Sequence, residues 1–88
     1  MRAKTLVLNA RDNVANALVD LHAEECVRVD VPERGELVIH LKQSIPLGHK
    51  LALKPIPIGA PAIKYGVPIG TATQDIAAGD HVHVHNLE

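Results

Sequence analysis

The sequence has 88 residues, a formal net charge of −1 with histidine neutral, and 47% hydrophobic residues, with one Tyr and neither Phe nor Trp. Because it lacks a basic stripe and aromatic side chains for base stacking, we expect no nucleic-acid partner. No apolar run approaches the roughly 18–20 residues of a membrane span, so we expect no membrane contact. The length predicts a single domain over residues 1–88. Six Gly and six Pro residues among many aliphatic ones favour a mostly β fold of short strands.

The first predicted elements are a short strand and the only helix. Residues 5–8, with the sequence TLVL, are expected to form the strand, and a polar turn follows. Asp12 or Asn13 is a suitable N-cap, because its side-chain oxygen can accept a hydrogen bond from a free N–H in the first turn of a helix. The next apolar residues recur at helical spacing, namely Val14, Ala17, Leu18 and Leu21. This pattern predicts a helix of about ten residues with one buried face.

A β-hairpin is predicted after the helix. Valines alternate with Cys, Arg and Asp in residues 26–31, and Leu, Ile and Leu alternate with Val, His and Lys in residues 37–42. The intervening residues 32–35, with the sequence PERG, have the composition of a turn. The first strand begins at Cys26, the one cysteine of the sequence. Because Cys26 has no partner for an internal disulfide, we expect a reducing, cytoplasmic location.

One turn pattern recurs in the second half of the sequence. Residues 45–48 (IPLG), 56–59 (IPIG) and 76–79 (IAAG) each precede a segment with strand character. The glycine allows a positive φ in a tight turn, and the isoleucine is expected to anchor the turn in the core. The copies are 11 and then 20 residues apart, which indicates a reused turn within a compact β structure and not a solenoid. Prolines at positions 55, 57, 61 and 68 exclude regular central strands from this region.

Three histidines alternate with valines near the end of the sequence. If residues 81–85 form a strand, His81, His83 and His85 share one face, because successive side chains of a strand point in opposite directions. Val82 and Val84 would then lie together on the buried face. The histidine face is either a site for chemistry or an exposed, hydrogen-bonded surface.

The spacing of these histidines limits how they can bind a metal ion. Neighbouring positions on one strand face are about 6.6–6.8 Å apart, so either adjacent pair can converge on one ion. The outer two positions are about 13 Å apart and cannot share an ion easily. A further ligand would have to come from His49, Asp80 or another chain.

Two pairs of polar residues are candidates for binding an anion or a hydroxyl. His49 and Lys50 follow the first of the recurring turns, which delivers them to the start of a strand. Lys64 and Tyr65 precede Gly66, and their side chains can bind a carboxylate and a hydroxyl. Ordinary exposed surface is the alternative for both pairs. No nucleophile and base pattern, phosphate loop or carboxylate pair is visible, so the catalytic residues are unknown at this point.

Several of these segments together resemble a known family. The segments are residues 45–53 (IPLGHKLAL), 63–66 (IKYG) and 81–86 (HVHVHN), with shorter matches between them. They resemble the SAF-type domain of the altronate and galactarate dehydratase family, which is a separate small subunit in some members. The alpha subunit of sulfolactate sulfo-lyase is similar too. The resemblance is close from residue 45 to residue 87 and looser before. It implies a β-clip (SAF-type) fold of short kinked strands, here with one short helix.

The resemblance also implies a function. The chain would be the small subunit of a metal-dependent sugar-acid hydro-lyase, inactive alone, and would help to close the substrate site of a separate large catalytic subunit. The implied cofactor is a divalent metal, iron or manganese, shared with that subunit. The implied metal ligands are His81, His83 and His85, and the implied substrate-binding residues are His49, Lys50, Lys64, Tyr65 and Asn86. The alternatives are a sulfolactate sulfo-lyase alpha subunit and a free-standing, non-enzymatic SAF-type binding module. The isolated chain could self-associate.

Overall fold

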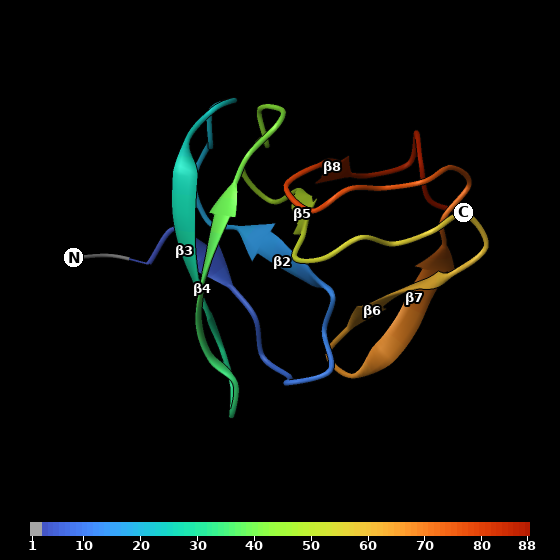
Figure 1. Cartoon of the computed structure of the whole chain (residues 1–88), viewed down its shortest axis with the longest axis horizontal. Helices are drawn as coiled ribbons and strands as arrows, with labels where there is room; N and C mark the ends of the chain where they lie inside the picture. The colour runs from blue at the N-terminus through green and yellow to red at the C-terminus, as the bar shows by residue number, and fades with distance from the viewer. Residues whose placement is uncertain (1–2) are drawn as a thin grey trace.

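A computed structural model describes residues 3–88, so the first two residues of the expected domain lie outside the described range. A four-stranded antiparallel sheet has the order β1 (Thr5–Leu6), β2 (Val14–Ala17), β5 (Lys50–Ala52) and β8 (His81–Val82). Two hairpins accompany it, β3 (Cys26–Val31) with β4 (Gly35–His40), and β6 (Pro61–Lys64) with β7 (Val67–Thr71). The hairpins lie at opposite ends of the molecule, with the central sheet between them (Figure 1). The predicted mostly β class is confirmed.

The helix predicted after Asp12 is wrong, because residues 3–88 contain no helix and Val14–Ala17 form strand β2. Consequently, no helix that could span a membrane occurs in this range. The expected N-cap residues bind the β6–β7 hairpin instead. Asp12 Oδ1 accepts the Gly66 N–H at 2.8 Å, and Asn13 Oδ1 accepts the Ile63 N–H at 2.6 Å. The apolar residues of β2 are buried on both faces, and such a strand does not show the alternation that distinguishes strands from helices.

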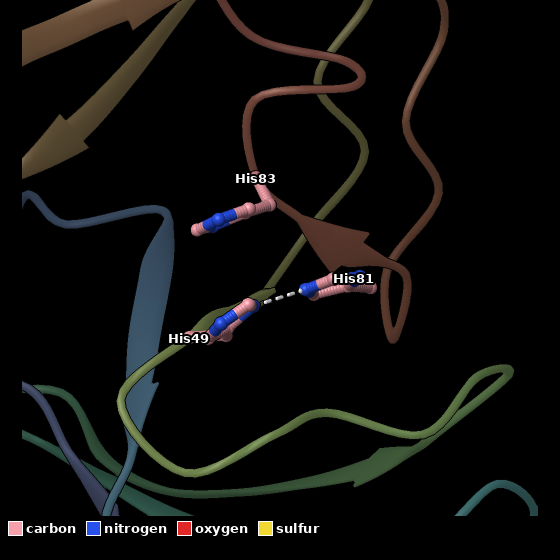
Figure 2. Close-up of side chains that lie close together, drawn as sticks. All are labelled: His49, His81 and His83. Atoms are coloured by element: carbon pink, nitrogen blue, oxygen red, sulfur yellow. Dashed lines mark hydrogen bonds between the residues drawn. The ribbon is translucent and has the colours of Figure 1, made fainter.

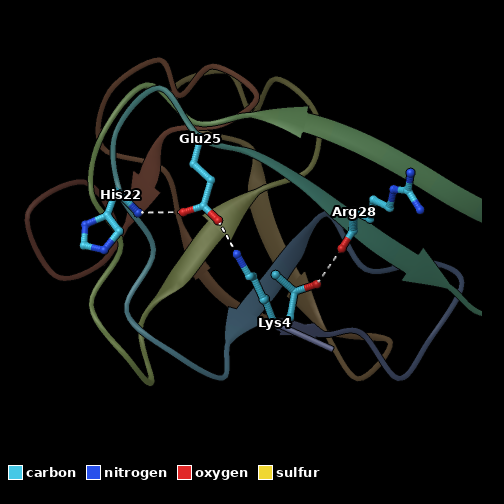
Figure 3. A network of polar contacts seen from close by, with 5 residues as sticks. Lys4, His22, Glu25 and Arg28 are labelled. Atoms are coloured by element: carbon cyan, nitrogen blue, oxygen red, sulfur yellow. Dashed lines mark hydrogen bonds and ion pairs between the residues drawn. The ribbon is translucent and has the colours of Figure 1, made fainter. Parts of the chain in front are cut away.

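The predicted hairpin is confirmed, although its second strand spans Gly35–His40 and not residues 37–42. Val27 pairs with Ile39 and Val29 with Leu37, so these four aliphatic residues lie on one face. Polar contacts fasten β1 and the residues before it to this hairpin (Figure 3). Thr5 Oγ1 donates to the Arg28 carbonyl at 3.2 Å, and Lys4 Nζ lies 2.7 Å from a Glu25 carboxylate oxygen.

The recurring turn occurs four times, once more than predicted. Leu21 pairs with Ile45 and Ile56 with Ile76, and each pair exchanges two backbone hydrogen bonds of 2.8–2.9 Å. The residue three positions later has a positive φ in every copy, 71° at Glu24, 85° at Gly48, 86° at Gly59 and 89° at Gly79. The first copy escaped prediction because Glu24 stands where the other copies have glycine.

Two successive structural repeats share strand β5. In the first repeat the Ala17 N–H donates to the His49 carbonyl at 2.8 Å, and in the second the Ala52 N–H donates to the Asp80 carbonyl at 3.0 Å. The Gly48 and Gly79 N–H groups donate back to Ala17 and Ala52, both at 2.9 Å. Each repeat has its own aliphatic core, one around Leu21 and Ile45 and one around Ile56 and Ile76. The repetition places β5 and β8 side by side and brings residues 49–50 next to residue 81.

Strand β8 is shorter than predicted and contains only His81 and Val82. Val82 is fully buried, but Val84 is 82% exposed, so the prediction that both valines share the buried face is wrong. The chain turns at His83, because the Asn86 side chain accepts the His83 N–H and the Asn86 N–H donates to the His83 carbonyl. His85 therefore lies beyond the end of strand β8.

Candidate metal and anion site

Three histidines from two strands gather at one edge of the central sheet. His49 immediately precedes β5, His81 begins β8, and His83 follows it. Strands β5 and β8 are antiparallel, and Leu51 lies opposite His81. Since alternate residues of a strand share a face, the three imidazoles come to the same side of the sheet. Figure 2 shows the three rings close together, with a dashed line for the contact between His49 and His81.

The rings of this histidine cluster, defined as His49, His81 and His83, are in contact. His49 Nδ1 lies 2.8 Å from His81 Nε2, within hydrogen-bond distance, so one nitrogen carries a proton and the other accepts it. The His49 and His83 rings are stacked, with centroids 3.9 Å apart and planes at 16°. The His85 ring lies 5.1 Å from that of His81, but His85 itself is exposed. The structure thus brings His49 into the group and leaves His85 at its margin.

The histidine cluster fits a divalent metal ion in donor type. One ring nitrogen from each histidine lies within 4.8 Å of the others. An ion that binds imidazole nitrogens at about 2.0–2.1 Å holds two of them no more than about 4.2 Å apart, so the rings would have to move closer by less than about 1 Å. The stacked rings would also have to rotate, because the lone pairs of parallel rings do not converge. All three side chains are only partly buried. Three imidazoles suit zinc, iron, nickel or copper and leave positions open for other ligands.

Two lysines, Lys50 and Lys64, lie close enough for their charges to interact, and the charge of Lys50 also acts on His83, so we group both with the histidine cluster as the cationic row. Lys50 is the first residue of β5, and burial, together with the positive charge of Lys64, lowers the pKa of its ammonium group. Lys64 ends β6, and its ammonium lies 4.8 Å from the centre of the Tyr65 ring. The structure therefore brings together the two lysines that the sequence singled out separately.

The electrostatic surroundings of the imidazoles are cationic. Burial lowers the pKa of His81, and His85, His49 and His83 lower it further. The pKa of His83 is lowered by burial and by His49, Lys50 and His85. All the groups whose charges lower these two pKa values are basic side chains, and the cationic row has no acidic member to repel an anion. The same surroundings favour the neutral imidazole, which is the form that binds metals.

Tyr65 belongs to a two-residue turn between β6 and β7. Its φ of 57° and the φ of 76° at Gly66 are those of the tight turn that joins antiparallel strands. A side chain at Gly66 would collide with Asn9, so the space next to this glycine is filled by the chain itself. The Tyr65 side chain is about half exposed and lies next to the Lys64 ammonium.

Asn86, predicted to bind substrate, is 4% exposed. Its Oδ1 accepts the His83 N–H at 3.0 Å, and its Nδ2 donates to the His81 carbonyl at 2.8 Å. Gln43 Oε1 accepts the His81 N–H at 2.9 Å. Both side chains therefore bind the backbone that carries the histidines.

Sequence reasoning missed Gln43 and Asn16. Asn16 lies opposite Lys50 on the neighbouring strand, and its Oδ1 is buried without a hydrogen-bond partner among residues 3–88. Gln43 lies in a loop, and nothing in the sequence near it indicates contact with residue 81. Asn16 was hidden because its segment was assigned to a helix. Because three of the four residues of VANA are buried apolar residues, the segment carries no alternation that would have revealed a strand.

A separate hollow of about 530 Å³ lies between β1 and β3. Its lining carries charges of both signs and no histidine: Ala3, Lys4, Thr5, Cys26, Val27, Arg28, Asp30 and Glu36. The hollow shares no residue with the cationic row. Because its lining has no histidine, we take the row as the stronger candidate for chemistry.

The fold and this site define a small all-β module whose edge carries a cationic, histidine-rich cluster. The chain belongs to the altronate/galactarate dehydratase SAF domain family, whose family model matches residues 3–88. This match confirms both the resemblance and the SAF-type fold inferred from the sequence.

The relatives include longer enzymes and a protein of comparable size. The chain is 51% identical over 79 residues to altronate dehydratase of Escherichia coli and 40% identical over 81 residues to that of Bacillus subtilis. These matches cover 90% and 92% of the chain but 15% of each dehydratase. It is also 49% identical over 56 residues to (2R)-sulfolactate sulfo-lyase subunit alpha of Paracoccus pantotrophus, covering 64% of the chain and 84% of that subunit.

Proposed function

We propose that this chain is the small subunit of a metal-dependent sugar-acid hydro-lyase of the altronate dehydratase type. Its cationic row closes the substrate site of a large catalytic subunit. The observation that carries the proposal is the convergence of His49, His81 and His83 beside Lys50 and Lys64, from segments far apart in the sequence. The family match and the dehydratases among the relatives support the same activity.

The lysines are suited to hold the carboxylate of a sugar acid. Lys50 and Lys64 lie close enough for their charges to interact, so an anion between them relieves their repulsion. Neutralising the substrate carboxylate also makes the proton on the adjacent carbon easier to remove. The unpartnered Asn16 Oδ1 beside Lys50 and the Tyr65 hydroxyl are available to the substrate's hydroxyl groups.

The histidine cluster is suited to hold the divalent metal. We assign His49, His81 and His83 as its ligands, which replaces His85 by His49 in the set predicted from sequence. A bound divalent ion supplies Lewis-acid stabilisation for charge that develops on substrate oxygens. Three protein ligands leave positions for groups from the substrate and the large subunit. We place the group that removes the substrate proton on the large subunit, because the members of the cationic row are assigned to the metal or to the substrate carboxylate.

We infer a partner subunit because the chain matches only a small share of each dehydratase. It matches 15% of the length of two altronate dehydratases, so most of each enzyme lies outside the matched segment. A relative of comparable size is named as subunit alpha of a sulfo-lyase. We therefore expect a large catalytic partner in the cytoplasm, as the single exposed thiol of Cys26 also favours.

The test is exchange of the matched segment. In the E. coli altronate dehydratase, the 79 residues that match this chain are replaced by the matching residues of this chain, and altronate turnover is measured. We expect the chimera to be active. A folded chimera of normal assembly with no altronate turnover would argue against a dehydratase role.

The second candidate is a sulfolactate sulfo-lyase alpha subunit, favoured by the 84% coverage of the Paracoccus subunit. Sulfite release from sulfolactate, measured with that enzyme's alpha subunit exchanged for this chain, distinguishes the two.

A further inference from the structure

The Asn86 side chain bridges the backbone of two histidines in the cluster. Its acceptor binds the His83 N–H and its donor binds the His81 carbonyl, at 3.0 and 2.8 Å. An amide is the side chain that offers an acceptor and a donor on one carbon without carrying charge. With 4% exposure, Asn86 makes these contacts in a site largely closed to water.

The same bridge occurs once more in the fold, without histidines. Asn13 Nδ2 donates to the Pro61 carbonyl at 3.0 Å, and its Oδ1 accepts the Ile63 N–H at 2.6 Å. In both places a buried asparagine binds the carbonyl of one residue and the N–H of the residue two positions later. The two asparagines are thus equivalent in structure, and they differ in what the bridged residues carry.

The bridge by Asn86 changes how the histidines lie. The strand ends at Val82, and the ring centroids of His81 and His83 are 5.6 Å apart, with nearly parallel planes at 10°. The turn after His83 also lets its ring stack on that of His49 at 3.9 Å. Gln43 fixes the other side of the same segment by accepting the His81 N–H.

We propose that Asn86 is a positioning residue for a metal site, because its amide sets the backbone turn that brings His83 onto His49 and His81. This inference rests on the proposed function, in which the three histidines bind a divalent ion. Asn86 is then no longer a residue that contacts the substrate. It acts instead by binding the backbone of the residues that hold the metal. Asn13 makes the same bridge for structural reasons alone.

The inference is tested by Co²⁺ titration of the tag-free chain. Wild type, Asn86→Ala, Asn86→Asp and Asn13→Ala are compared by calorimetry and by the visible absorption of bound Co²⁺, with melting temperatures measured in parallel. Asn86→Asp keeps the acceptor for the His83 N–H but places a carboxylate oxygen against the His81 carbonyl. It serves as the second variant if Asn86→Ala does not fold. His83→Ala removes one proposed ligand and so shows whether Co²⁺ binds at the histidine cluster.

We expect Asn86→Ala and Asn86→Asp to weaken Co²⁺ binding roughly tenfold or more and to alter the absorption spectrum, as loss of groups that orient metal ligands commonly does. Asn13→Ala should lower the melting temperature similarly while keeping wild-type affinity and spectrum. Equal effects of Asn86→Ala and Asn13→Ala on affinity and spectrum, with wild type binding Co²⁺ at His83, would overturn the positioning role alone. Absence of Co²⁺ binding by wild type would overturn the metal site of the proposed function and this inference with it.

Discussion

His49 Nδ1 and His81 Nε2 lie 2.8 Å apart although the two residues are 32 positions apart in the sequence. The contact exists because the two repeats share β5, which places the residue before β5 beside the first residue of β8. A metal site at this point would therefore join the two repeats. His49 joins the proposed ligand set because of strand pairing, and not because of its position in the sequence.

The ligand assignment predicts which histidine substitutions weaken metal binding. His49→Ala, His81→Ala and His83→Ala should each reduce the affinity for Mn²⁺ or Co²⁺ by roughly tenfold or more, because each removes one of three ligands. His85→Ala should leave the affinity nearly unchanged, since His85 is exposed at the margin. Calorimetric titration of the four variants checks this. If His85→Ala had a large effect and His49→Ala none, the set expected from sequence alone would be correct.

The lowered pKa of His81 predicts acid-sensitive stability. Burial and neighbouring bases hold its pKa below the usual value of 6.5 in the folded chain. As the pH falls below 6.5, the unfolded chain binds a proton at His81 that the folded chain binds only at lower pH, so the free energy of unfolding decreases. Urea unfolding at pH 7.5 and 5.5 should therefore show a smaller loss for His81→Gln than for wild type. His22→Gln, outside the histidine cluster, should keep the wild-type loss, and an undiminished loss in His81→Gln would contradict the prediction.

Two glycines of the recurring turn predict different costs of substitution. Gly59 and Gly79 have similar φ values, 86° and 89°, so either change to Ala introduces the unfavourable left-handed conformation, worth about 1–2 kcal/mol. A Cβ at Gly59 meets nothing within 4 Å, whereas a Cβ at Gly79 collides with the His40 carbonyl. Gly79→Ala should therefore lower the free energy of unfolding by about 1–3 kcal/mol more than Gly59→Ala. Equal losses in chemical denaturation would show that the backbone around His40 moves freely.

The lysine pair predicts a defect in substrate binding. In the E. coli chimera, Lys50→Ala or Lys64→Ala should raise KM for altronate by about 10–100-fold, the range expected for loss of one hydrogen bond to a charged group. Lys54→Ala, which removes an exposed lysine outside the cationic row, is the matched control. Steady-state kinetics give the values. An unchanged KM in both variants would place the substrate carboxylate elsewhere.

The parts of the fold with a clear local signal could be predicted from the sequence. The hairpin of β3 and β4 follows from alternating valines around a PERG turn, and the recurring turn follows from isoleucine and glycine at fixed spacing. The region of β2 could not be assigned correctly, because Val14 and Ala17 are buried on opposite faces in different cores and happen to have helical spacing. Local sequence does not reveal which core a small residue enters.

The candidate site was predictable in residue type and less so in arrangement. The sequence singled out His49, Lys50 and Lys64, and the structure brings them to one row with His81 and His83. The strand assumed for residues 81–85 ends early, because a side chain three residues beyond His83 binds its backbone. Such a contact between a side chain and a nearby backbone group leaves no periodic trace in the sequence.

The central claim is that the cationic row forms part of a dehydratase substrate site, and altronate turnover by the chimera carrying His83→Ala or Lys64→Ala tests it most directly. His22→Ala is the control, and gel filtration confirms assembly. We predict that both substitutions reduce kcat/KM for altronate by at least about tenfold, equivalent to about 1.4 kcal/mol of lost transition-state stabilisation, while His22→Ala does not. Unchanged turnover in both variants, with intact assembly, would contradict the claim and leave the row as a surface that only holds the partner.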